Sequence, residues 1–302
     1  MFRQRLQHEV RAVARVSIGL PTLNGAEFIA ESLRCLQEQT FEDFEVAISD
    51  NGSTDGTSEI CAEFARRDKR FHHFRLEQTI PWLQNFSRVR DLLQGPYFMW
   101  RADDDLAAPN HIESLVSHLD SEPNADLAVA KIRRIIEEPV RTERLFDLPQ
   151  LPDGPHLARV KELTLNCHPS WFYGLWRRET VVRDWDLVVQ RYETLWASDH
   201  LALLPSLLDG KVALAFDTEF IQRIKRPNQI YRLDPEKLMQ TRTKYKALAV
   251  EMLNARSWSA DDRHQVEAIL EQHIEQRVAR KWAMRRRILK SKIKSLIIRN
   301  QH

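Results

Sequence analysis

Two groups of carboxylate residues, about fifty positions apart, are the side chains of this sequence best suited to chemistry. The first lies in the run from Asp50 to Asp55 (DNGSTD), and the second is the triplet from Asp103 to Asp105. Each follows a short apolar run that is typical of a strand, and each precedes a helix-like segment. Because ligands of open α/β sheets bind outside the carboxyl ends of the strands, both groups can border one crevice. Crowded carboxylates repel one another, so this arrangement favours a divalent cation that carries a phosphorylated substrate.

The segments around these groups predict an α/β fold. Apolar runs typical of strands lie at 16–20, 44–49, 71–76, 97–100, 127–130, 172–176 and 212–216. Helical patterns lie between them, beginning after Asn24, Thr57, Trp82 and Pro109 and at 200–208. Strands that alternate with helices of this length imply a largely parallel sheet. Residues 135–155, which are rich in proline, are expected to form an irregular surface excursion.

The pattern changes near the last quarter of the chain, where only helical periodicity remains. Helices are expected from Asp234 and from Asp261, the second continuing past Trp282. We therefore predict a first domain at 1–233 and a C-terminal helical extension at 234–302.

The end of this extension is strongly basic. Ten Lys or Arg residues and no Asp or Glu follow Gln276, and Trp282 and several aliphatic residues lie among them. Such a segment resembles an interfacial amphipathic helix that binds anionic lipid. The alternative is a helix that packs on the first domain and turns a solvated basic face outward. No nucleic-acid-binding motif accompanies the charge, so no nucleic acid partner is expected.

The bulk properties are those of a globular protein of ordinary composition. The chain has 302 residues, a net charge of +2 and three cysteines without metal-like spacing, which fits a reducing compartment. The first residues lack the apolar run of a secretory signal, and no stretch is long and apolar enough for a transmembrane helix. We expect a cytoplasmic protein, which the basic helix could hold to the cytoplasmic face of a membrane.

Several motifs in order resemble family 2 glycosyltransferases of the GT-A fold. They are Val16–Thr57, Gly95–Asp120 with its acidic triplet, Trp171–Arg178, the Ala197–His200 run and Leu208–Lys211. The resemblance covers roughly residues 15 to 232. It implies inverting, metal-dependent transfer of a sugar from a nucleoside diphosphate, with UDP the expected nucleotide. The acceptor would be a carbohydrate or a lipid-linked molecule, and the context synthesis of bacterial cell-surface polysaccharide.

Two alternatives stay open beside this reading. One is a sugar nucleotidyltransferase, although Leu20–Gly25 lacks the glycine-rich, basic phosphate loop that such an enzyme needs. The other is a glycosyltransferase-like protein that binds lipid or nucleotide and has lost activity. That possibility arises because the family often has an acid where this chain has Ala102, and a histidine near the position of Arg226.

The resemblance implies that Asp50 accepts the imino N–H of the donor base, which uracil offers and unprotonated adenine does not. The alternative is that the run from Asp50 is only a turn and helix cap. The residues expected to bind the donor are Pro21, Thr22, Asn24, Asp50, Asn51, Asp103, Arg223, Lys225 and Arg226.

The acidic triplet is expected to hold Mg²⁺ or Mn²⁺. Asp104 is the expected direct ligand, Asp103 would contact the ribose or the metal, and Asp105 would support them. One carboxylate with diphosphate oxygens and waters is a usual magnesium arrangement. The alternative is an acidic helix N-terminus, which the helix dipole favours.

The acceptor side is expected to contain the general base. Asp199 resembles the family's base, although Ser-Asp before a helix is also a common N-cap pair. Trp171, Tyr173 and His168 are expected to line the acceptor pocket, because aromatic faces suit sugar rings. They could equally belong to the core.

Overall fold

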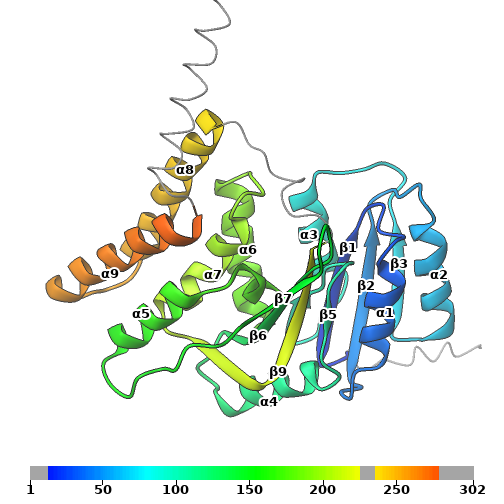
Figure 1. Ribbon diagram of the computed structural model, residues 1–302, viewed down its shortest axis with the longest axis horizontal. Helices are drawn as coiled ribbons and strands as arrows, with labels where there is room; N and C mark the ends of the chain where they lie inside the picture. Colours follow the sequence, from blue (N-terminus) through cyan, green and yellow to red (C-terminus); the bar gives the residue numbers. More distant parts are fainter. Residues whose placement is uncertain (1–12, 225–234, 279–302) are drawn as a thin grey trace, which may run out of the picture.

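A mixed sheet between two layers of helices forms the centre of the molecule (Figure 1). The computed structural model describes residues 13–224 and 235–278. Within these residues the sheet has nine strands, with the order β3-β2-β1-β4-β8-β6-β9-β5 and β7 paired to β6. The strands are β1 (Val16–Thr22), β2 (Phe44–Asp50), β3 (Phe71–Arg75), β4 (Tyr97–Trp100), β5 (Leu106–Ala107), β6 (Leu127–Ile136), β7 (Thr142–Phe146), β8 (Leu175–Arg177) and β9 (Val212–Ile224).

The strand directions bring both acidic groups to one edge of the sheet. β1 pairs in parallel with β2 and with β4, so the three strands end on the same side. β2 ends at Asp50, and two residues separate the end of β4 from the acidic triplet. The α/β architecture of a mostly parallel sheet is therefore confirmed, and with it the expectation that the two groups share an edge.

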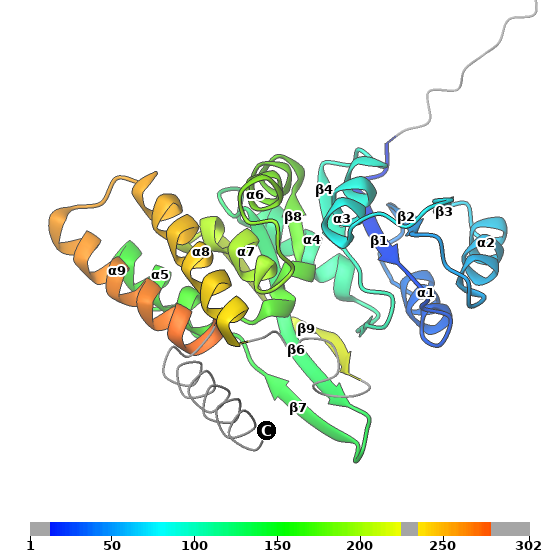
Figure 2. The same cartoon turned by 90° about the horizontal axis from the view of Figure 1, so that it is seen from above.

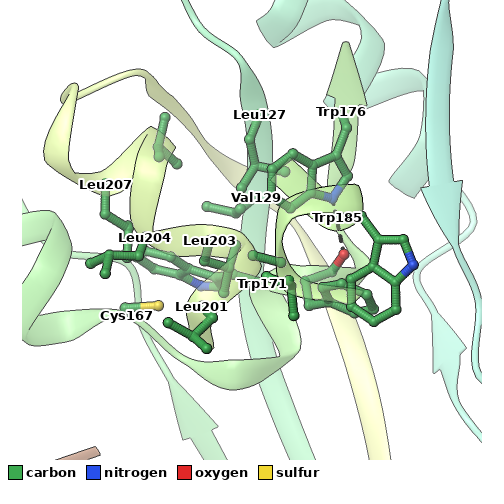
Figure 3. Close-up of a cluster of buried hydrophobic side chains, with 14 of the residues drawn as sticks. Leu127, Val129, Cys167, Trp171, Trp176, Trp185, Leu201, Leu203, Leu204 and Leu207 are labelled. Atoms are coloured by element: carbon green, nitrogen blue, oxygen red, sulfur yellow. Dashed lines mark hydrogen bonds between the residues drawn. The ribbon is translucent and has the colours of Figure 1, made fainter. Parts of the chain in front are cut away.

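Helices cover both faces of the sheet because each buries one apolar stripe against it. One face carries α1 (Ile29–Gln37), α2 (Thr57–Arg67) and α4 (His111–Ser121), whose apolar residues form one buried cluster with β1, β2 and β4. A second cluster lies on the other face, with α3 (Trp82–Asp91), α5 (His156–Asn166), the 3₁₀ helix η1 (Pro169–Tyr173), α6 (Arg178–Arg191) and α7 (Ser198–Leu208). Figure 3 draws Leu201, Leu203 and Leu204 of α7 together with Leu127 and Val129 of β6 as members of this cluster.

The described part of the C-terminal extension joins the second cluster. It consists of α8 (Pro235–Asn254), α9 (Ala260–His273) and a π-helical turn (Ile274–Val278), and Figure 2 shows α8 and α9 beside α5 and α7. Tyr245, Leu253 and Val266 are fully buried in the same cluster as Val129 of the sheet. The last strand ends at Ile224 and α8 begins at Pro235, and these helices share the core of the first domain.

Three segments differ from the sequence expectations. The expected strand at 172–176 is η1 followed by the short β8, and 135–155 contains the end of β6 and all of β7. β6 and β9 also run further than expected, because residues 131–136 pair with 219–224 beyond a register irregularity. Charged and polar side chains interrupt the apolar ones in this extension, so no continuous apolar run predicts it. The sequence reading also missed α5 and α6.

No described helix is long and apolar enough to cross a membrane. The predicted basic amphipathic helix lies almost wholly outside the described residues.

Candidate active site

A buried carboxylate, that of Asp50, lies at the end of β2. Asp50 is fully buried, and its Oδ1 accepts the backbone N–H of Ser53 at 2.8 Å. Within the described parts of the chain its Oδ2 has no hydrogen-bond partner, while His73 Nε2 lies 3.6 Å and Arg75 Nε 3.9 Å from it. Burial opposes ionisation, but hydrogen bonds from Ser53 and Ser58 outweigh it and lower the pKa of Asp50. Asp50 is therefore an ionised acceptor with a free lone pair.

Two asparagines predicted to bind the donor hold the loops around Asp50. Asn24 adopts a left-handed conformation (φ 56°), its N–H donates to Ser53 Oγ, and its Oδ1 accepts the N–H of Thr54 at 2.9 Å. The side chain of Asn51 bonds the backbone of Ile80 twice, donating to its oxygen and accepting its N–H at 2.9 Å each. The protein itself thus occupies Oδ1 of Asn24 and the whole amide group of Asn51.

The acidic triplet approaches the end of β1. Thr22 Oγ1 donates to Asp103 Oδ2, while Pro21 is buried in β1 beside Ser49 of β2. A Cβ on Gly25 would stand 2.4 Å from the same Asp103 oxygen, so only glycine allows this approach. The structure therefore brings the predicted residues of β1 and of the triplet into direct contact.

The carboxylates of the triplet are poorly neutralised. Burial raises the pKa of Asp103 to about 6, and the charge of Asp104 adds to the effect. Burial also raises the pKa values of Asp104 and Asp105. Among the described residues, none of the three forms a salt bridge with a Lys or Arg side chain.

Arg223 of β9 fixes the loop that carries the triplet. Its backbone N–H donates to Asp105 Oδ1 at 2.8 Å, and its guanidinium bonds the carbonyl of Asp104 and the carboxylate of Glu31. Among the described residues, its Nη2 has no hydrogen-bond partner. Arg223 was predicted to bind the donor, and the structure places it in contact with Asp104 and Asp105. Lys225 and Arg226 lie outside the described residues.

The triplet suits a divalent cation that takes its remaining ligands from the substrate and from water. No group of three His, Cys, Asp or Glu side chains in the described parts of the chain could hold a metal ion by itself. Asp103 and Asp104 could supply one or two carboxylates, and Mg²⁺ commonly takes its other ligands from phosphates and water. Their raised pKa values fit this assignment, because a bound cation would offset the repulsion.

Asp199 lies in the first turn of α7. The N-cap of this helix is Ala197, with φ 58° and no side-chain capping bond, so Asp199 is not the capping residue. Its Oδ1 accepts the N–H of His200 at 2.8 Å, yet burial raises its pKa to about 6. A carboxylate with that pKa can take up a proton near neutral pH.

Tyr173 connects the triplet with Asp199. Its ring stacks on Phe220 with centroids 5.5 Å apart and an interplanar angle of 6°. Burial raises the pKa of its hydroxyl, and the charges of Asp105, Asp104, Asp199 and Asp103 raise it further. The charges of all four carboxylates therefore act on one hydroxyl, that of the half-buried Tyr173.

The other two predicted acceptor residues are buried. Trp171 is 2% exposed and belongs to the core cluster drawn in Figure 3. His168 is 5% exposed, its Nδ1 accepts the N–H of Ser170, and its Nε2 lies 2.9 Å from a guanidinium nitrogen of Arg134. These contacts give both side chains packing roles in the structure.

The family model described as "Glycosyl transferase family 2" matches residues 17–185, which is more than half of the chain. The chain belongs to glycosyl transferase family 2. Curated relatives include an uncharacterized glycosyltransferase of Haemophilus influenzae, 26% identical over 123 residues. Another is glycosyltransferase GlyG of Streptococcus pneumoniae, 27% identical over 114 residues. The aligned parts cover 41% and 38% of this chain and only 38% of each relative.

Solved structures confirm the GT-A fold of this family 2 glycosyltransferase chain. Residues 1–349 of TarS from S. aureus match 87% of the chain with a TM-score of 0.66 and 16% identity, over 72% of that structure. TarS 1–349 in complex with UDP-GlcNAc matches with a TM-score of 0.65 and 18% identity, over 87% of this chain and 73% of that one. The mannosyltransferase PcManGT from Pyrobaculum calidifontis, in complex with GDP-Man and Mn²⁺, gives 0.52 and 15% over 95% and 88%.

The family 2 match covers many, but not all, of the predicted site residues. It includes Asp50, Asp103 and Asp104 but ends before Asp199 and Arg223. The assignment of the latter two therefore depends more strongly on the geometry of the structure.

One exposed aromatic residue near the Asn51 loop was not singled out in the sequence of this family 2 chain. Trp82 begins α3 and is 38% exposed, whereas Trp171 is almost fully buried. Asn51 holds Ile80, two residues before Trp82, and the Trp82 ring lies 4.8 Å from Phe86. From the sequence, a tryptophan after a proline could be buried or exposed, so the exposure of Trp82 became evident only in the structure.

Proposed function

We propose that this protein is an inverting, metal-dependent glycosyltransferase that transfers a sugar from a UDP-linked donor to a carbohydrate or lipid-linked acceptor. The proposal rests on the acidic triplet, which Thr22 and Arg223 hold at the sheet edge that Asp50 shares, and on Asp199 at the start of α7. A transferase needs a place for the leaving diphosphate and a base for the incoming hydroxyl, and these groups suit the two tasks.

The surroundings of Asp50 support uracil as the base of the donor. Uracil presents one N–H between two carbonyl oxygens, and Asp50 Oδ2 is an acceptor with Arg75 and His73 beside it as donors. Guanine presents two adjacent donors, but Asp50 has only one free oxygen because Ser53 occupies the other. This pattern favours UDP over GDP and ADP.

The leaving group would lie against the triplet and Arg223. Asp103 and Asp104 are the residues that would hold Mg²⁺ or Mn²⁺. When bound, the cation would offset the charge that develops on the departing diphosphate. Thr22 orients Asp103 through its hydroxyl, and Arg223 holds the carbonyl of Asp104, so the loop keeps its shape. The unpartnered Nη2 of Arg223 is a further donor near this charge.

Asp199 would remove the proton from the acceptor hydroxyl as that oxygen attacks the anomeric carbon. Attack from the face opposite the diphosphate inverts the anomeric configuration. The raised pKa of Asp199 suits this role, because a stronger base accepts the proton more readily. Tyr173 stands beside it, and the exposed indole of Trp82 offers an apolar face for the acceptor.

Synthesis of a cell-surface polysaccharide is the pathway that the resemblance to family 2 glycosyltransferases favours. Attachment to an anionic membrane surface would depend on the basic C-terminal segment.

The test is a panel of nucleotide sugars, incubated with and without Mn²⁺, with nucleoside diphosphate release as the readout. We expect release from UDP-sugars that depends on Mn²⁺ and increases when an acceptor sugar is added. Release from ADP- or GDP-sugars at equal rates would contradict the role of Asp50. Absence of both release and UDP binding would contradict the proposed function.

A further inference from the structure

The turn that presents Asp199 is held by a buried tyrosine. Tyr192 ends α6 at its C-cap, is 1% exposed, and its hydroxyl donates to the carbonyl of Trp196 at 2.8 Å. Ser198 closes the same turn, because its N–H and its hydroxyl both reach the carbonyl of Leu195, at 3.3 and 3.0 Å. The hydrogen bond of Tyr192 therefore spans the turn just before α7 begins.

This turn contains two residues in an uncommon conformation. Glu193 has φ 53° and Ala197 has φ 58°, a region that residues other than glycine seldom adopt. Ala197 also accepts the first helical hydrogen bond of α7, from the N–H of Leu201. Since Asp199 follows Ala197 by two residues, the dihedral angles of Ala197 determine where the Asp199 carboxylate points. A strained turn persists only where surrounding contacts fix it.

The C-terminal extension supplies the support for Tyr192. Tyr245 of α8 is fully buried and meets the Tyr192 ring edge-on, with centroids 6.1 Å apart and an interplanar angle of 81°. Its hydroxyl lies 3.4 Å from Nε2 of His273 in α9, whose Nδ1 lies 2.8 Å from the carbonyl of Thr164. That carbonyl can only accept, so His273 Nδ1 carries the proton and Nε2 is left to accept from Tyr245. Helices α8 and α9 are thereby fixed to α5 directly behind the turn.

Electrostatics agree with this proximity. Burial raises the pKa values of Tyr192 and Tyr245, and the charge of Asp199 raises both further. The base, the turn and the C-terminal helices therefore form one buried unit.

We infer that Tyr192 is a positioning residue for Asp199, and that α8 holds Tyr192 in place through Tyr245. The hydroxyl of Tyr192 holds the 193–197 turn in the conformation that aims the Asp199 carboxylate at the acceptor. This inference rests on the proposed function insofar as Asp199 is the base. We call the hydrogen bond by which Tyr192 holds the 193–197 turn the clamp, and its effect on the turn can be tested separately.

The test compares Tyr192→Phe with Tyr97→Phe. Both variants keep the ring and lose one partly buried hydrogen bond of the phenol hydroxyl. In Tyr97 this bond goes to Asp120 (2.7 Å), and it lies at the start of β4, away from the end that leads to the acidic triplet. In Tyr192→Phe, amide hydrogen exchange should accelerate in residues 193–199, while Tyr97→Phe leaves this segment unchanged. The kcat for transfer should fall about 10- to 100-fold in Tyr192→Phe, as expected when a reacting group is misplaced, with unchanged KM for the donor.

A rescue variant separates positioning from loss of stability. Ala197→Gly removes the conformational penalty in the turn, so Tyr192→Phe/Ala197→Gly should recover much of the lost kcat. Unchanged exchange at 193–199 in Tyr192→Phe would overturn the inference, whatever the activity. So would a full kcat in Tyr192→Phe when Asp199→Asn is inactive. If Asp199→Asn keeps full activity while the exchange changes, the clamp stands and the assignment of the base fails.

Discussion

Replacing Asp199 by asparagine should inactivate the protein and stabilise it at the same time. Asparagine keeps the shape of the side chain and can still accept the N–H of His200, but it cannot take up a proton. Loss of a positioned general base typically costs about 10²–10⁴-fold in rate, so we expect kcat to fall by at least about 10². The KM for the donor should not change, because Asp199 serves the acceptor.

The expected gain in stability follows from the pKa of Asp199. Burial raises it from 3.8 to about 6, so the folded protein bears the cost of ionising a carboxyl that resists ionisation. One unit of pKa corresponds to about 1.4 kcal/mol, which gives at most about 3 kcal/mol. Because the side chain is partly exposed, we expect solvent screening to reduce this to about 1–2 kcal/mol.

The pH dependence has opposite signs for stability and for activity. Below the unfolded pKa, Asp199 is neutral in both states and the variant has no advantage. As the pH rises through about 4 to 6, the unfolded chain ionises first and wild type loses stability relative to the variant. Above about pH 6 the difference is constant. The transfer rate of wild type should rise over the same range, because only ionised Asp199 acts as a base.

Urea unfolding at pH 8 and pH 4 measures the stability difference, and initial transfer rates from pH 5 to 9 measure activity. Asp261→Asn is a matched control, since Asp261 is an exposed acid in the first turn of α9 and should give no gain at pH 8. An Asp199→Asn protein that is less stable than wild type at pH 8 would refute the reasoning, because it would mean that Asp199 makes a stabilising contact. A transfer rate independent of pH between 5 and 7 would refute the assignment of the base.

Four further changes test the rest of the site. Asp104→Asn should abolish Mn²⁺-dependent UDP binding without unfolding the protein, and unchanged calorimetric affinity would contradict its role as a metal ligand. Asp50→Asn should cost about 1.5–3 kcal/mol of UDP affinity by competition binding, and equal competition by ADP would show that Asp50 does not read the base. Trp82→Ala should raise the acceptor KM and leave the donor KM unchanged, and the reverse pattern would exclude an acceptor role. Truncation after Val278 should abolish low-salt co-sedimentation with anionic vesicles while keeping the buried Ile274, and full-length protein that stays in the supernatant would contradict membrane binding.

The parts of the site that depend on local sequence could be predicted. Asp50 and the acidic triplet follow apolar runs directly, and the strand ends they occupy are set by short-range patterns. The alternation of strands and helices then places both groups at one edge, because parallel strands end on the same side. The helix that contains Asp199 was predicted from its apolar run, whereas the choice of Asp199 as the base came from the resemblance to the family.

The parts that depend on distant contacts could not be predicted. Whether Trp171 is exposed or buried depends on α6 and α7, which pack over it, and the amide of Asn51 bonds a residue 29 positions away. Arg223 reaches the triplet only because β9 continues beyond the expected strand end and pairs with the extension of β6. Helix α6 escaped prediction because its mixed charged surface hides a narrow apolar stripe, of which Val181, Trp185 and Val188 are buried.

Two aspartates of this site show how hydrogen bonding decides the task of a carboxylate. Asp50 is completely buried, yet its pKa is low because Ser53 and Ser58 donate to it, so it stays ionised and can act as a fixed acceptor for a base. Asp199 has few such donors, and burial therefore raises its pKa toward neutrality, where a carboxylate can take up a proton. A donor added beside Asp199 would thus stabilise its charge and weaken it as a base, whereas removal of the Ser53 contact would make Asp50 a weaker reader of uracil. In the proposed mechanism, one residue type would serve both recognition and proton transfer, because the hydrogen-bond donors around the two carboxylates differ.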